Sequence, residues 1–173
     1  MPELQTGSYH ANNFIRAFRR WFVPYVQSRV MSDEFRPLLS YLFTEWKCNV
    51  DCHYCWAFNN KVKGMTEECA ISSIDWLKSV GCRVIAIMGG EPLLRRDFIL
   101  KVVDYGTKNG FFVYLPTNGI LMNEDFIDRV GDRGVAAINL AVDSVEERPG
   151  LPKNFRRIEK QFKYLVKQQR QYG

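Results

Sequence analysis

Short apolar segments alternate four times with longer segments of helical periodicity along residues 38–172 of this 173-residue chain. The apolar segments cover residues 38–44, 83–88, 111–115 and 135–142. Near-continuous apolar runs are typical of strands buried on both faces, and strands that alternate with helices form parallel sheets with right-handed crossovers. The chain is therefore predicted to have an α/β fold built on one parallel sheet.

Capping residues support the predicted helices. Thr66 and Asn123 stand at two helix starts, where a side-chain oxygen can accept a hydrogen bond from a free backbone N–H group. Gly81 and Gly110 follow two of the helices, where glycine is a common terminating residue. A last helix is expected over about residues 155–172. These boundaries predict four βα units.

Three cysteines follow the first predicted strand with the spacing C-x3-C-x2-C, at Cys48, Cys52 and Cys55. Three thiolates on one loop can hold three corners of a cubane iron–sulfur cluster, whereas most such clusters take a fourth cysteine. One iron would then keep a coordination position that the protein does not fill, as the metal does in catalytic zinc sites. The spacing therefore predicts a reactive iron–sulfur centre.

Zinc binding and thiol redox chemistry are the alternative interpretations of these cysteines. His53 is a candidate fourth zinc ligand, and residues 52–55 have the C-x-x-C form of a redox pair. Zinc ligands usually come as two separated pairs, however, and the sequence holds no second pair. The other cysteines and the other histidine are isolated in the sequence, at Cys69, Cys82 and His10. A zinc-binding or non-catalytic iron–sulfur module stays open as the alternative.

The second predicted strand leads directly into Gly89, Gly90, Glu91 and Pro92. Combined with the cysteine loop, in which Tyr54 is the aromatic residue before the last cysteine, this turn resembles the radical S-adenosylmethionine (radical SAM) superfamily. That family has a C-x3-C-x-aromatic-C loop after its first barrel strand and a Gly-Gly-Glu-Pro turn after its second. The cysteine loop also resembles the branch of peptide-modifying and hopanoid-type enzymes.

This resemblance implies both a fold and an activity. The fold would be a partial TIM-type (β/α) barrel, in which this chain supplies about four βα units of a usual six. The activity would be that of a radical SAM enzyme with a [4Fe-4S] cluster on Cys48, Cys52 and Cys55 and S-adenosyl-L-methionine (SAM) at the open iron. Reductive cleavage of SAM would give a 5′-deoxyadenosyl radical that abstracts hydrogen from a substrate. An electron donor of the flavodoxin or ferredoxin type would be a partner.

The resemblance further implies which residues bind SAM. Gly89, Gly90 and Glu91 would contact its amino end, because glycines let the backbone come close and Glu91 adds negative charge near the SAM ammonium. Tyr54 would pack beside the adenine.

Two further candidate sites lie at the ends of the third and fourth predicted strands. Thr117 and Asn118 would face SAM or substrate, although Asn-Gly is also a common turn pair. Asp143 would hydrogen-bond SAM or substrate, or else cap the loop that follows it. Active sites of parallel barrels assemble at the carboxyl ends of the strands, so all four motifs are expected to meet at one site.

Residues 1–36 are predicted to be an N-terminal extension, and residues 37–173 the incomplete radical SAM core. Aromatic residues recur at three- and four-residue intervals over residues 14–30, which indicates an amphipathic helix that Pro24 kinks or interrupts. A helix that caps the bottom of the barrel is favoured. A peripheral membrane anchor, which would fit a lipid or lipid-linked substrate, and a partner-binding helix stay open.

Charge and cysteine content limit the possible partners and the cellular compartment of the protein. The net charge is +5 and the pI about 9.0, but the basic residues are spread out and no recognition motif accompanies them, so no nucleic-acid partner is expected. Five cysteines, an odd number, argue against a disulfide framework. An oxygen-labile cluster also requires reduced cysteines, which predicts a cytoplasmic location.

The sequence stops at Gly173, about where a fifth strand would be expected to begin. The fourth strand would then be an uncovered edge rich in apolar residues, and such edges pair with other strands. We therefore expect either a missing C-terminal half or a half-barrel completed by a dimer or by another chain. The substrate stays unknown, with a lipid and a peptide as candidates.

Overall fold

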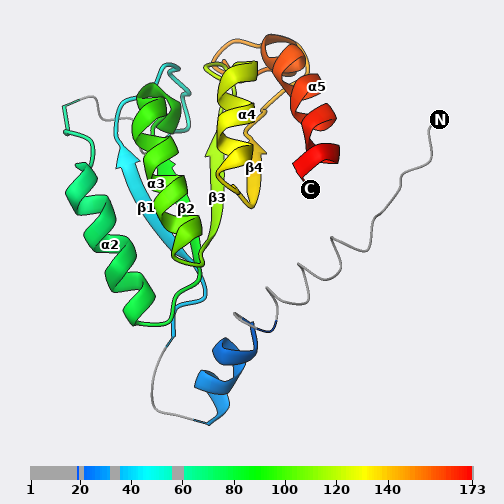
Figure 1. The fold of residues 1–173 in the computed structure, drawn as a ribbon. Helices are drawn as coiled ribbons and strands as arrows, with labels where there is room; N and C mark the ends of the chain where they lie inside the picture. Colours follow the sequence, from blue (N-terminus) through cyan, green and yellow to red (C-terminus); the bar gives the residue numbers. More distant parts are fainter. Residues whose placement is uncertain (1–18, 20–21, 32–35, 56–60, 173) are drawn as a thin grey trace.

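A computed structural model describes residues 19, 22–31, 36–55 and 61–172 of the chain. At its centre is a four-stranded sheet in the order β1-β2-β3-β4, and all three neighbouring pairs are parallel. The strands are β1 (Ser40–Glu45), β2 (Val84–Gly89), β3 (Phe112–Thr117) and β4 (Ala137–Leu140). The predicted α/β fold is confirmed, and the sheet is open, with β1 and β4 at its edges (Figure 1).

Helices alternate with the strands along the chain. They are α2 (Glu67–Ser79), α3 (Arg96–Lys108), α4 (Glu124–Asp132) and α5 (Phe155–Tyr172), with a short 3-10 helix, η1 (Pro92–Arg95), before α3. In Figure 1, α2, α3 and α4 lie over one face of the sheet, and each helix contacts the next along the chain. This is the arrangement of one part of a (β/α) barrel wall.

The predicted N-caps are confirmed at two helices. The Thr66 hydroxyl accepts a hydrogen bond from the backbone N–H of Cys69 at 3.2 Å. Asn123 Oδ1 accepts one from the backbone N–H of Phe126 at 2.9 Å. Each contact satisfies one of the backbone donors that the first turn of a helix leaves free.

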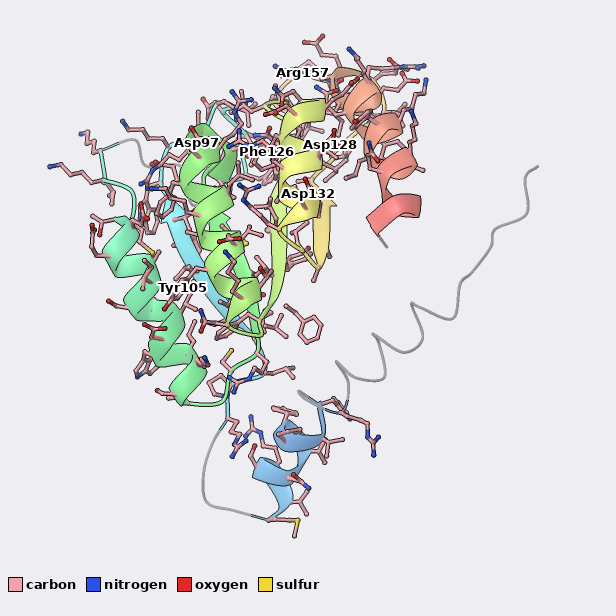
Figure 2. All side chains as sticks on the ribbon, in the orientation of Figure 1. Asp97, Tyr105, Phe126, Asp128, Asp132 and Arg157 are labelled. Carbon is pink, nitrogen blue, oxygen red and sulfur yellow. The ribbon has the colours of Figure 1, made fainter. Side chains whose placement is uncertain are left out.

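The hydrophobic core lies between the sheet and its covering helices. Alternate strand residues such as Ile85 and Leu115 are at most 1% exposed, and Phe126 of α4, labelled between α3 and α4 in Figure 2, is equally buried. Successive strand residues point to opposite faces, so Tyr41, which is 59% exposed, belongs to the other face of the sheet. The helices cover the buried face, and the parallel pairing of the four strands brings their carboxyl ends to one edge.

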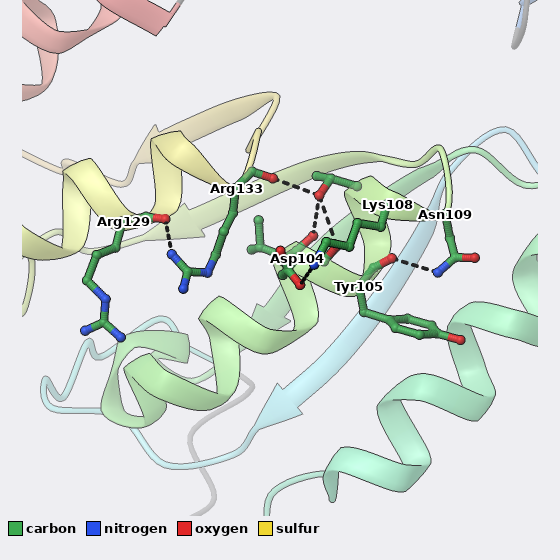
Figure 3. Close-up of polar contacts among 8 residues, drawn as sticks. Asp104, Tyr105, Lys108, Asn109, Arg129 and Arg133 are labelled. Atoms are coloured by element: carbon green, nitrogen blue, oxygen red, sulfur yellow. Dashed lines mark hydrogen bonds and ion pairs between the residues drawn. The ribbon is translucent and has the colours of Figure 1, made fainter.

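A hydrogen bond connects the carboxyl ends of α3 and α4 at the opposite, amino-terminal edge of the sheet. The Thr107 hydroxyl donates to the carbonyl of Arg133 at 2.7 Å (Figure 3). Lys108 pairs with Asp104 at 2.6 Å in the same region. This polar cluster lies where each helix ends and the next strand begins, far from the loops that follow the strands.

The strand boundaries differ from the predicted ones by one or two residues. Leu38 and Leu39 precede β1 and are 40% and 38% exposed. The fourth strand is shorter than predicted and pairs with β3 only over residues 137–140. Apolar character predicts burial, but the hydrogen bonds to a neighbouring strand decide where a strand begins and ends.

Residues 22–30 form a helix in the N-terminal extension, which Figure 1 shows apart from the sheet. Its apolar side chains are partly exposed, for example Val26 at 38%. The other aromatic residues on which the predicted amphipathic face depends, Phe14, Phe18 and Trp21, lie outside the described residues. The role of this helix therefore stays a prediction. Among the described residues, no helix has the length and apolar character needed to cross a membrane.

Candidate functional site

The cysteine loop leaves the carboxyl end of β1, and Glu45 fixes its first residues. The buried Glu45 carboxylate accepts hydrogen bonds from the backbone N–H groups of Trp46 and Lys47 at 2.9 and 3.0 Å. Arg95 lies 4.0 Å from the same carboxylate and donates to the carbonyl of Thr44 at 3.1 Å. The loop therefore has a defined conformation before its first cysteine.

The Gly89-Gly90 turn packs backbone to backbone against this loop. The N–H groups of Gly90 and Glu91 donate to the carbonyls of Glu45 and Lys47 at 2.7 and 2.8 Å. A methyl group on Gly89 would lie 2.3 Å from the Glu45 carbonyl oxygen, and one on Gly90 would lie 2.3 Å from that of Lys47. Neither glycine has a positive φ. Both positions therefore require glycine because the two backbone segments lie very close together, and not because of an unusual dihedral angle.

Glu91 connects the turn after β2 with the loop after β3. Its side chain is 1% exposed and accepts hydrogen bonds from the Leu93 N–H at 2.9 Å, the Thr117 hydroxyl at 2.7 Å and the Asn118 N–H at 2.9 Å. Burial raises the pKa of the Glu91 carboxyl, although these donors act in the opposite direction. The carboxylate is directed mainly at donors of its own chain, so its contact with the SAM ammonium stays a prediction.

Thr117 and Asn118 extend from the end of β3 toward the cysteine loop. Asn118 Nδ2 donates to Asn49 Oδ1 at 2.7 Å, and the Cys48 sulfur lies 3.8 Å from the same oxygen. The side chains of Thr117 and Asn118 also accept hydrogen bonds from backbone N–H groups of their own turn. Asn118 therefore stabilises its own turn and also contacts the cysteine loop, whereas Thr117 bonds Glu91 and its own turn.

The segment after β4 holds the other end of the cysteine loop. The Tyr54 hydroxyl donates to the Asp143 carboxylate, with oxygen distances of 2.6 and 2.7 Å. His53 Nδ1 lies 2.8 Å from the carbonyl oxygen of Gly150. Lys153 Nζ lies 3.5 Å from Asp143 Oδ1 and 5.0 Å from the centre of the Tyr54 ring. Asp143 thus positions Tyr54 directly, and its contact with SAM or substrate stays a prediction.

Lys153 is the charged residue of this site that the sequence did not identify. It stands between Pro152 and the last helix with no motif around it, and only its place after a strand end hints at a role. Burial lowers the pKa of Lys153, but contacts with Tyr54, Asp143 and Cys52 outweigh burial, so the net pKa is raised. The side chain is therefore a cation at neutral pH.

These loops surround one cavity of about 200 Å³ at the carboxyl edge of the sheet, the upper edge in Figure 1. Its lining includes Cys48, Cys52, Tyr54, Cys55, Gly89, Gly90, Glu91, Thr117, Asn118 and Lys153. Asp143, the one predicted site residue outside this lining, is bonded to Tyr54 and Lys153. A larger cavity of about 390 Å³, between α4 and α5, is lined by none of the predicted site residues. The structure thus gathers the four motifs around one cavity, and their binding roles stay predictions.

The three cysteines of the loop supply thiol donors that suit an iron–sulfur cluster, and their metal binding stays a prediction. All three thiols are free and line the same cavity. Across the described part of the chain, however, no three Cys, His, Asp or Glu side chains are grouped so that they could bind one metal ion. Burial raises the pKa of Cys48 and Cys52, and metal cations would favour their thiolate forms.

Comparison with protein families identifies the chain. The sequence pattern of the Radical SAM superfamily matches residues 47–169, which is most of the chain. The chain therefore belongs to the radical SAM superfamily. The resemblance inferred from the cysteine loop and the Gly-Gly-Glu-Pro turn is confirmed.

Curated relatives match the core of this chain, but their names indicate different reactions. The AdoMet-dependent heme synthase of Methanosarcina barkeri is 30% identical over 118 residues, which is 64% of this chain and 34% of that protein. The probable GTP 3′,8-cyclase of Methanopyrus kandleri is 32% identical over 109 residues, which is 59% of this chain and 33% of that protein. The matched part of this chain thus spans about a third of the length of either relative.

A solved structure supports the same architecture. Native anSMEcpe with bound AdoMet superimposes with a TM-score of 0.60 and 23% sequence identity, over 76% of this chain and 41% of that one. At this identity the likeness shows the fold alone. It confirms the predicted partial (β/α) barrel, here as a four-stranded sheet that does not close.

Proposed function

We propose that this chain is the cluster- and SAM-binding part of a radical SAM enzyme, with Cys48, Cys52 and Cys55 as ligands of a [4Fe-4S] cluster. One observation carries the proposal: three free thiols and the loops after all four strands surround a single cavity. A relative and a solved structure whose names include AdoMet support SAM as the second cofactor.

The chain's own residues would orient and shield these cofactors. When bound, the cluster would supply one-electron reduction of SAM, which is the source of the family's radical chemistry. The cysteine loop is held against β2 by hydrogen bonds that Glu45 accepts and by those that the Gly90 and Glu91 N–H groups donate. Phe43 and Met88 are among the apolar residues that line the cavity and exclude water.

The partners follow from this chemistry. Enzymes of this superfamily need a reductant and a substrate. We propose a flavodoxin- or ferredoxin-type donor and a cytoplasmic, reducing location, which would keep the cysteine ligands of an oxygen-labile cluster reduced. The heme and GTP names of the relatives leave the substrate class open, and a lipid or a peptide remains a candidate. Membrane contact through residues 14–30, and completion by a C-terminal half or a second copy, also remain proposals.

Anaerobic reconstitution tests the proposed function. The chain is loaded with iron and sulfide, given SAM and dithionite, and assayed by chromatography for 5′-deoxyadenosine. Wild type should form this product, and Cys52→Ala should form none, because the cluster would lose one of three ligands. Cys69→Ala is the matched control, since Cys69 is exposed on α2 and does not line the cavity.

The alternative function predicts a different outcome from the same experiment. A colourless protein that binds zinc tightly and forms no 5′-deoxyadenosine would favour a zinc-binding module. A brown protein with iron and sulfide but no product would favour an iron–sulfur module without turnover. Either result would contradict the proposal for this chain.

A further inference from the structure

Lys153 is enclosed in the wall of the cysteine cavity. Its side chain is 16% exposed, and its ammonium lies 3.5 Å from the Asp143 carboxylate and 5.0 Å from the Tyr54 ring centre. Among the described residues it is the one lysine or arginine that lines this cavity. A largely buried cation therefore shares the cavity with three thiols and the Glu91 carboxylate.

The backbone and a neighbouring side chain hold residue 153 in place, so the ammonium is not needed for this. The Lys153 carbonyl accepts a hydrogen bond from the Asp143 N–H at 2.8 Å, and Ser144 forms a parallel bridge with Asn154. Asn154 Oδ1 also accepts from the N–H of Arg157, at the start of α5 in Figure 2, at 3.1 Å. None of these bonds involves the Lys153 side chain. A neutral side chain at this position should therefore leave the segment folded.

The charges around the cavity favour a role for the cation. Three thiolates outweigh the formal charge of the oxidised cubane core that they would hold, so the assembly is an anion. One-electron reduction makes it more negative, and the nearby Asp143 carboxylate opposes that change. The apolar residues Phe43, Val50 and Met88 also line the cavity and solvate added negative charge poorly. A nearby ammonium stabilises the reduced form more than the oxidised form.

We propose that Lys153 raises the reduction potential of the cluster, so that a one-electron donor of the flavodoxin or ferredoxin class can reduce it. The inference rests on the proposed function, because it requires the cluster on Cys48, Cys52 and Cys55. One electron passes from the donor to the cluster, the donor is oxidised, and no bond or proton of Lys153 changes. Lys153 acts through its fixed positive charge.

The test is a redox titration of the reconstituted chain without SAM, followed by electron paramagnetic resonance of the reduced cluster. Lys153→Met keeps an apolar stem and removes the charge. At a fixed potential its ratio of reduced to oxidised cluster should fall about tenfold, which corresponds to about 59 mV for one electron. Lys153→Arg should titrate like wild type because it keeps the charge.

Two further variants separate the effect of charge from loss of structure. Lys108→Met removes the same charge at the amino-terminal edge of the sheet, where Lys108 pairs with Asp104, and should leave the potential unchanged (Figure 3). Asp143→Asn removes a negative charge near the cluster, so it should shift the potential upward, opposite to Lys153→Met. A purely structural role for the Lys153–Asp143 pair predicts shifts in the same direction, with loss of iron in both variants.

The outcomes distinguish this inference from the proposed function. If wild type and Lys153→Met hold equal iron and titrate at the same potential, the role of Lys153 is refuted while the cluster assignment stands. If Lys153→Met and Asp143→Asn shift the reduction potential in the same direction, the charge argument is refuted. If wild type assembles no cluster, both the proposed function and this inference are refuted.

Discussion

The contact between Gly90 and the Lys47 carbonyl shows how little space separates the two motifs. A methyl group at residue 90 would lie 2.3 Å from the carbonyl oxygen and 2.6 Å from the carbonyl carbon of Lys47, and backbone atoms cannot move aside as a side chain can. Gly90→Ala should therefore displace the cysteine loop and lower the free energy of unfolding by about 1–3 kcal/mol. Denaturant unfolding of the metal-free chain measures this change.

Gly106→Ala is the control for this substitution. Its methyl group would meet only a side-chain carbon of Val113, at 3.1 Å, inside a helix that favours alanine. A loss of stability in Gly106→Ala as large as that in Gly90→Ala would contradict the close-approach argument. Reduced iron loading is expected only for the variant at residue 90.

The buried carboxyl of Glu91 should make stability depend on pH. Burial raises its folded-state pKa above the ordinary value of 4.5. The folded chain therefore holds a proton that the unfolded chain has released, so stability should fall as pH rises from about 4.5 through the raised pKa. Unfolding of the metal-free chain at several pH values should show a weaker decline in Glu91→Gln than in wild type. The exposed Glu147→Gln should follow wild type, and a parallel decline in Glu91→Gln would exclude Glu91 as the cause.

Among the elements, α4 depends on its N-cap. Asn123 Oδ1 satisfies the N–H of Phe126, whose ring is one of the largest fully buried side chains. Asn123→Ala should lower the free energy of unfolding by about 1 kcal/mol, because that donor loses its partner. Asn123→Asp should retain most of the stability, since a carboxylate also accepts this bond and interacts favourably with the helix dipole. Denaturant unfolding of both variants measures the difference. If Asn123→Ala is as stable as wild type, water satisfies the Phe126 N–H group equally well and the prediction is wrong.

In the whole molecule, the cavity depends on the alignment of all four strands. Each strand contributes the loop that follows it, and the parallel order β1-β2-β3-β4 places these loops side by side. The outer edge of β4 pairs with no other strand among the described residues. The four loops together form one wall of the cavity.

Local sequence patterns were sufficient to predict much of the fold and of the candidate site. The apolar periods, the caps at Thr66 and Asn123, and the spacing of the cysteines each lie within one short segment. They predicted the parallel sheet, the helix starts and the family. The strand ends were less well predicted, because hydrogen bonds to the neighbouring strand set them.

The sequence by itself determined the order of strands and helices, the cysteine loop and the Gly-Gly-Glu-Pro turn, because each of these is encoded by neighbouring residues. Only the tertiary structure decided that Glu91 bonds Thr117 and Asn118, and that Lys153 lies beside Tyr54 and the cysteines. These partners are separated along the chain by whole βα units. Their contacts follow from strand register and helix packing, which no local pattern specifies.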